Sequence, residues 1–249
     1  EDYPRELQRV KLYLADHNVF GVDLNPIAVE LAEVSLWLNA LSGGHNVPWF
    51  GYQLFCGNSL IGARREVYPA SALKKQPKEG LWYNRAPRRL DPASLRDPSG
   101  EGDRSPEEIY HFLLPDPGMV GYNDKVAKQL RPEAFKQINQ WKKAFCAPLD
   151  ADDIRTLQEL SQAVDRLWRE HTQMLARDRA RTEDAHRLWG QQDADLPAME
   201  TRQSSTREKD DIHTSGIFNT HARMASPFRR LKLAMDYWCA LWFWPLDQI

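Results

Sequence analysis

Residues 19–28, near the N-terminus, read Val-Phe-Gly-Val-Asp-Leu-Asn-Pro-Ile-Ala, and they give the clearest indication of the fold. The short apolar run over residues 19–24, which carries an acid near its end, is typical of a buried parallel strand. Asn25 and Pro26 stop this strand. Pro26 suits the first turn of a helix, because the N–H that it lacks would have no partner there.

The residues after Pro26 predict a helix and then a second strand. Apolar residues recur at helical spacing over residues 26–41 and mark one face, formed by Ile27, Leu31, Val34, Leu38 and Leu41. Ser-Gly-Gly at residues 42–44 ends the helix, and a second apolar run follows at residues 52–56. The order strand, helix, strand predicts a βαβ unit with a right-handed crossover.

Polar side chains follow both predicted strands. Asp23 ends the first strand and Asn58 comes just after the second. Ligands of open α/β sheets bind outside the carboxyl ends of the strands, where a carboxylate can accept both hydroxyls of a ribose. Leu24 would face a flat adenine, and the Asn58 amide could address its edge. Two plainer interpretations stay open, in which Asp23 caps the following helix and Asn58 is a turn residue.

Two segments carry a resemblance to a known family. Residues 23–28 read Asp-Leu-Asn-Pro-Ile-Ala and are followed by Ser-Leu-Trp at residues 35–37, while residues 57–60 read Gly-Asn-Ser-Leu. Together they resemble the second and third motifs of large adenine-specific DNA methyltransferases that use S-adenosylmethionine. These are the type IIG restriction–modification enzymes and the methylases of the BREX and DISARM phage-defence systems. Residues 111–115 and 238–245 also resemble the DISARM-type methylases.

The resemblance implies a partial class I, Rossmann-like methyltransferase core. It places Asp23 on the ribose hydroxyls of S-adenosylmethionine, Leu24 against its adenine, and Asn58 with Ser59 at the adenine edge. At the position of Asn58 the family more often has an aspartate. A hydrogen bond from the adenine to the Asn58 amide oxygen therefore lacks the negative charge that would strengthen it. The reaction implied for the parent enzyme is methyl transfer to the exocyclic amine of adenine in double-stranded DNA, with defence-system proteins as further partners.

The motifs that would make the chain active are absent from its sequence. No glycine-rich loop precedes Asp23, and no Asn-Pro-Pro-aromatic motif, which holds the flipped base in the family, occurs anywhere. We therefore assign no catalytic residue. We expect an internal piece of a larger enzyme, inactive alone.

Changes in composition and hydrophobic periodicity along the chain predict three regions. Residues 1–63 form the partial cofactor-binding core, and residues 64–103, rich in Pro, Arg, Asp and Ser, form an irregular, mildly basic excursion. Residues 104–249 form a mainly helical insertion. Its expected parts are a long helical hairpin over about 132–189, a loose segment over 190–216 and a terminal helix over 226–244.

Composition excludes some classes of protein. The net charge of −2 does not indicate an isolated nucleic-acid-binding domain. The three cysteines and seven histidines show no metal-ligand spacing, so we predict no metal site. No secretory leader or membrane-spanning stretch is visible, which predicts a cytoplasmic protein without a membrane partner.

Two rival functions stay open. A Rossmann oxidoreductase also places an acid after its second strand, but needs a Gly-x-Gly-x-x-Gly turn before it. A non-catalytic helical scaffold could bind DNA or a partner protein. The arginines between Arg64 and Arg96 could contact DNA phosphates, or they could belong to a solvated loop. The aromatic residues 237–244 could stack on bases, although packing is their commoner role.

Overall fold

The computed structural model describes residues 2–41, 48–74, 80–96, 102–184, 188, 204–219 and 226–245. The chain forms two compact units. The first contains residues 1–60 and 173–223, and the second contains residues 61–172 and 224–249. This division differs from the predicted one, because residues 173–223 leave the expected helical domain and join the N-terminal unit. The boundary after Leu60 lies close to the one expected at residue 63.

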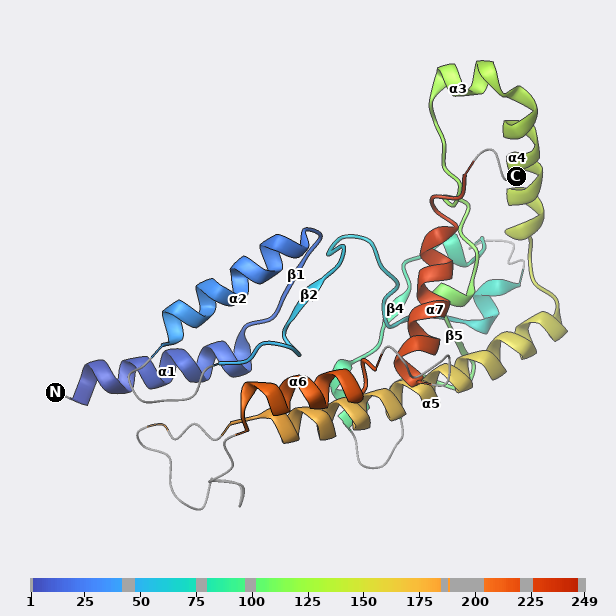
Figure 1. The fold of residues 1–249 in the computed structure, drawn as a ribbon. Helices are drawn as coiled ribbons and strands as arrows, with labels where there is room; N and C mark the ends of the chain where they lie inside the picture. Colours follow the sequence, from blue (N-terminus) through green and yellow to red (C-terminus); the bar gives the residue numbers. More distant parts are fainter. Residues whose placement is uncertain are drawn as a thin grey trace. The chain divides into compact units, whose positions relative to one another are not determined.

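The first unit contains a strand, a helix and a parallel strand where the sequence pattern predicts them. Strand β1 (Gly21–Asp23) pairs in parallel with β2 (Leu54–Cys56), and α2 (Pro26–Ala40) connects them (Figure 1). Asn25 caps α2, since its side chain accepts a hydrogen bond from the Ile27 N–H. Helix α1 (Asp2–Asn18), which the sequence analysis did not predict, precedes β1.

The face of α2 that packs is not the face that the sequence marked. The core of this region joins Leu12 and Ala15 of α1 to Ala40 and Phe50. The predicted apolar stripe is instead 42–63% exposed; it consists of Ile27, Leu31, Val34, Leu38 and Leu41. The helical spacing therefore marked a real apolar face of α2, but the described part of the chain leaves this face exposed.

The first unit also contains a helix within the segment predicted to be loose. Helix α6 (Thr206–Ser215) runs along the last turns of α5 (Ala151–Thr182) (Figure 1). It begins with a capping box, in which the Ser205 side chain accepts from the Glu208 N–H and the Glu208 side chain accepts from the Ser205 N–H. Lys209 of α6 pairs with Asp184, and the two side chains are only 2% and 4% exposed. The cap and this buried ion pair fix the helix, so the expectation of loose chain was wrong for residues 206–215. Residues 190–203 lie outside the described ranges.

The second unit is built around a small antiparallel sheet. Strand β3 (Glu66–Pro69) lies between β4 (Arg88–Arg89) and β5 (Glu108–Tyr110). Short 3₁₀ turns flank the strands at Ala70–Leu73, Trp82–Asn84, Pro92–Arg96 and His111–Leu113. Because Val67, Leu73 and Trp82 are at most 1% exposed, residues 64–103 supply core and are not the irregular excursion that their composition suggested.

The helices of the second unit form, but not as a hairpin. They are α3 (Lys125–Leu130), α4 (Pro132–Phe145), the first part of α5, up to Thr172, and α7 (Pro227–Ala240). Ile154 and Val164 of α5 pack against the sheet, whereas Ile138 of α4 packs with Met119 and Val120. The expected packing of α4 on α5 was wrong because the sheet takes the apolar face of α5.

The terminal helix α7 begins as predicted, since the Ser226 side chain accepts from the Arg229 N–H. It ends at Ala240, before the predicted residue 244. Trp238 packs into the core and donates through Nε1 to the Leu114 carbonyl at 3.0 Å. Most of this aromatic segment therefore packs, while Tyr237 and Phe243 stay exposed. No helix among the described ranges is long and apolar enough to cross a membrane.

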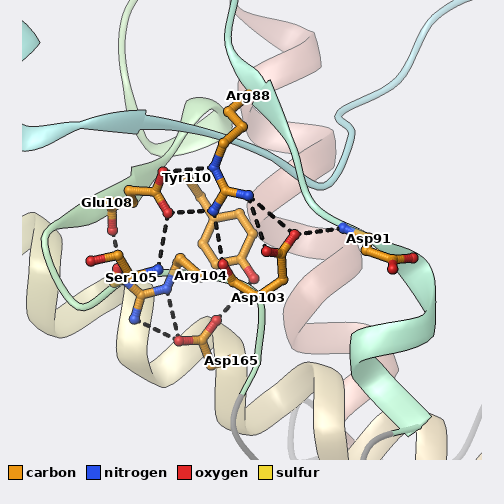
Figure 2. Close-up of polar contacts among 8 residues, drawn as sticks. All are labelled: Arg88, Asp91, Asp103, Arg104, Ser105, Glu108, Tyr110 and Asp165. Carbon is orange, nitrogen blue, oxygen red and sulfur yellow. Dashed lines mark hydrogen bonds and ion pairs between the residues drawn. The ribbon is translucent and has the colours of Figure 1, made fainter.

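Ion pairs tie the sheet of the second unit together (Figure 2). The Arg88 guanidinium donates to both Glu108 oxygens at 2.8 and 2.6 Å and to Asp103 at 3.1 Å. The hydrogen bond from Arg88 is the main cause that lowers the pKa of Glu108. Arg89 pairs with Glu66 at 3.1 Å. Arg88 thus belongs to a network of ion pairs within the sheet, whereas Arg89, whose side chain is 75% exposed, makes a single surface pair among the described residues.

Candidate functional site

The parallel pairing of β1 and β2 brings the predicted cofactor residues to one end of the sheet. Asp23 stands opposite Cys56, and the Gly57 N–H donates to the Asp23 carbonyl at 2.8 Å. Leu24 directly follows Asp23, while Asn58 and Ser59 directly follow Gly57. The carboxyl ends of parallel strands meet at one edge, so the four side chains start from neighbouring positions.

The local hydrogen bonds show whether Asp23 caps the helix and whether Asn58 stabilises a turn. Asp23 Oδ1 accepts from the Asn25 N–H at 2.8 Å, while Asn25 itself caps α2. Asp23 is therefore not the helix cap. Asn58 Oδ1 accepts from the Leu60 N–H at 2.8 Å, so this residue does stabilise the turn after β2.

The residues at this edge have the chemistry that an adenosyl group requires. The Asp23 side chain is exposed, and its Oδ1 bond to Asn25 fixes the direction of a carboxylate that still offers Oδ2. Leu24 is 70% exposed, so it presents an apolar surface that an adenine face could cover. Asn58 and Ser59 are also exposed and carry amide and hydroxyl groups. The donor set therefore fits the cofactor that the sequence motifs imply.

A second feature of the first unit was missed by the sequence analysis. A cavity of about 450 Å³ lies between α2 and α6 and is lined by Glu33, Trp37, Trp49, Asp210 and His213, among others. Trp49 Nε1 donates to Asp210 Oδ1 at 2.8 Å. Burial, the nearby Glu30 and then Asp210 raise the pKa of Glu33. No sequence signal joins Glu33 to Asp210, because they lie on helices far apart in the chain.

The described histidines have structural contacts. His111 Nε2 lies 2.9 Å from the Arg64 backbone N, His171 stacks on Phe228, and burial is the main cause that lowers the pKa of both histidines. Within the described ranges, no group of three or more His, Cys, Asp or Glu residues could hold a metal ion. His45, His186 and His221 fall outside these ranges.

Comparison with known proteins gives one partial relationship. No protein-family model and no solved structure matches the chain. A protein of Methanocaldococcus jannaschii named "Putative type II restriction enzyme and methyltransferase RM.MjaORFECS2P" is 38% identical over 66 residues. The match covers 23% of this chain and only 6% of that protein, so the chain spans a small part of its relative's length. Part of the chain is thus similar to a protein named as a restriction enzyme and methyltransferase.

Proposed function

We propose that this chain is part of a DNA methyltransferase of a restriction–modification or phage-defence system, which transfers the methyl group of S-adenosylmethionine to the exocyclic amine of adenine. The observation that carries the proposal is the pairing of β1 with β2, which sets Asp23 and Asn58 at the same end of a parallel sheet. The partial similarity to a restriction–modification methyltransferase supports the same assignment.

Each residue has a distinct task in this proposal. The Asp23 carboxylate binds the ribose hydroxyls, Leu24 packs on the adenine ring, and Asn58 with Ser59 holds the adenine edge. The cofactor, when bound, supplies an electrophilic methyl group. These residues only bind and orient it. Because the chain lacks the Asn-Pro-Pro-aromatic motif, other parts of the parent enzyme must position the target adenine.

The exposed apolar side chains of the first unit support a place within a larger sheet. Phe20, Val22 and Phe55 on or beside the two strands are exposed, as is the stripe on α2. Exposed apolar side chains gathered on one part of a protein often mark an interface. We infer that further strands and helices of the parent enzyme cover them.

The test is calorimetric titration of the chain with S-adenosylmethionine and, separately, with NAD. We expect binding of S-adenosylmethionine that Asp23→Ala weakens by tenfold or more, because a hydrogen bond to a charged group contributes roughly 1.5–3 kcal/mol. The control Glu30→Gln, which removes another exposed acid of the same unit, should leave affinity unchanged. Binding of NAD in place of S-adenosylmethionine would establish the oxidoreductase alternative.

The scaffold alternative makes a different prediction. It requires the chain to bind DNA or a partner protein without cofactor, through its helical region over residues 104–249 or through the basic side chains of residues 64–96. Arg88 and Arg89 pair with carboxylates, so contact of these two arginines with DNA would have to displace those ion pairs. A DNA shift assay on the full chain tests it directly.

A further inference from the structure

Positive charge is concentrated on α3 and α4 of the second unit. The segment from Lys125 to Lys143 contains six lysines or arginines and a single carboxylate, Glu133, whereas the whole chain has a net charge of −2. The overall balance of charge therefore conceals a basic region. This region is separate from the arginines of residues 64–96.

A groove follows one face of α4. Its volume is about 610 Å³, and its lining includes Lys128 of α3 and Phe135, Lys136, Asn139, Gln140 and Lys143 of α4. The positions on α4 recur at helical spacing, so they share one face of the helix. The lining contains three lysines and no carboxylate. Lys128 Nζ lies over the Phe135 ring, 5.8 Å from its centroid, and this contact holds its charge at the groove.

The opposite face of α4 is used for packing. Ile138 is buried, and Trp141 packs in the same cluster of the core. A basic helix that lies on an anionic membrane needs an apolar face to enter the lipid. Because α4 keeps its apolar face in the core, its basic face does not suit a lipid surface. Val126 and Leu130 of α3 are exposed, but neither lines the groove.

Two amides lie between the lysines of α4. Asn139 and Gln140 are exposed, and their side chains have no hydrogen-bond partner among the described residues. A lysine only donates hydrogen bonds, whereas an amide both donates and accepts. The carboxylates of an acidic protein would pair with the lysines but leave the amide oxygens without a donor. An adenine in the major groove of DNA matches both functions, because its N7 accepts from an amide and its N6 amine donates to it.

The spacing of the lysines also suits the double helix. Lys136 and Lys143 are separated by two turns of α4, or about 10.5 Å at a rise of about 1.5 Å per residue. The major groove is about 12 Å wide and has phosphates on both sides. When the amides face the base edges, the two lysines can therefore reach phosphates on either side of the groove.

We propose that α3 and α4 bind double-stranded DNA. Asn139 and Gln140 face the base edges in the major groove, and Lys128, Lys136 and Lys143 contact phosphates. The inference adds a DNA-binding surface to the proposed function but does not depend on the cofactor site, which belongs to the first unit. DNA binding through α4 is compatible with the methyltransferase and with the scaffold, and the titration with S-adenosylmethionine separates these two.

The test is the fluorescence anisotropy of a short, labelled, mixed-sequence DNA duplex, titrated with the full chain without cofactor at about 50 to 200 mM salt. The logarithm of the affinity should fall linearly with the logarithm of the salt concentration, with a slope of about −0.9 for each phosphate contact. The double variant Lys136→Gln, Lys143→Gln should bind more weakly and make this slope shallower by about 1.8, because it loses two contacts.

A matched control separates the groove from general surface charge. The double variant Arg155→Gln, Arg166→Gln removes the same charge from exposed positions of α5 in the second unit and should leave the slope unchanged. No binding of the duplex at about 50 mM salt would overturn the proposal. Equal changes of slope in the lysine variant and the arginine control would also overturn it.

Two further measurements test the occupant. Poly-glutamate represents an acidic protein, and vesicles that contain phosphatidylserine represent a membrane; both should bind more weakly than the duplex. Binding of either as tight as that of the duplex, and weakened by the same lysine changes, would overturn the proposal. Selection from a random duplex pool should enrich an adenine-containing sequence with the wild type but not with the double variant Asn139→Ala, Gln140→Ala. Identical pools from both proteins would overturn the contact with base edges.

Discussion

Replacing Asp165 with alanine should destabilise the second unit more than any change to an exposed ion pair. Asp165 Oδ2 accepts from Arg104 Nε and Nη2 at 2.8 and 2.6 Å, and Oδ1 accepts from the Tyr110 hydroxyl at 2.9 Å (Figure 2). The Arg104 side chain is only 4% exposed, whereas Asp165 is 26% exposed. The Asp165→Ala variant would leave two guanidinium donors and one buried charge without their partner.

The magnitude follows from this burial. Removing one partner of a fully buried ion pair costs about 3–5 kcal/mol. Because a quarter of the Asp165 side chain reaches solvent, water replaces part of the lost interaction, and we expect about 2–3 kcal/mol. Asp165→Asn keeps the acceptor oxygen but loses the charge, so it should cost less than alanine. Tyr110→Phe removes one hydrogen bond and should cost about 1 kcal/mol.

Urea denaturation, followed by tryptophan fluorescence, measures these differences. With a slope of about 1–3 kcal/mol per molar urea, the alanine variant should lower the unfolding midpoint by roughly 1 M. The matched control is Asp236→Ala in the same unit, whose pair with Lys232 is more than half exposed and should contribute under about 1 kcal/mol. If Asp165→Ala shifts the midpoint no further than Asp236→Ala, burial of Arg104 does not strengthen its ion pair with Asp165.

Two further predictions concern the first unit. Burial and the nearby Asp178 raise the pKa of Tyr52 to about 12. In the unfolded chain the tyrosine hydroxyl loses its proton near pH 10, before it does so in the folded chain. The stability that Tyr52 contributes is therefore intact below about pH 10 and is lost as the pH rises toward about 12. At pH 11 the wild type should have lost about 1.4 kcal/mol of its free energy of unfolding through Tyr52, and Tyr52→Phe should remove this loss. At pH 8 the variant should be nearly as stable as the wild type, because the hydroxyl is buried without a partner among the described residues. Urea midpoints at both pH values check this, and an unchanged alkaline loss in the variant would count against it. Ser205→Ala breaks the capping box of α6 and should cost about 1 kcal/mol. Relative to the wild type, the variant should exchange the amide protons of α6 faster and leave those of α2 unchanged. Unchanged exchange in α6 would show that the cap contributes nothing.

The sequence predicted those elements whose local signals are strong. Strand β1 and helix α2 follow from an apolar run, an Asn-Pro boundary and helical periodicity, and the joint position of Asp23 and Asn58 follows from parallel pairing. The same periodicity could not reveal that α2 leaves its apolar stripe open. Periodicity marks an apolar face but does not identify what covers it.

The remaining elements lack a local signal. Strands β3, β4 and β5 are two to four residues long, too short for alternation to stand out among the prolines and arginines of residues 64–103. Helix α6 did carry a signal, the Ser205–Glu208 capping box, but its polar composition concealed it. The pairing of Lys209 with Asp184 and the cavity shared by Glu33 and Asp210 depend on tertiary contacts alone.

Each of the two units is made of two separate segments of the chain, which limits where the protein can be truncated without damage to both units. The chain leaves the N-terminal unit after Leu60, returns to it at Gln173 along the single helix α5, and leaves again after Arg223. Neither unit is therefore one continuous gene segment. A single insertion, deletion or recombination event cannot add or remove either one cleanly, and a clone starting at residue 104 would lack β3, the middle strand of its own sheet.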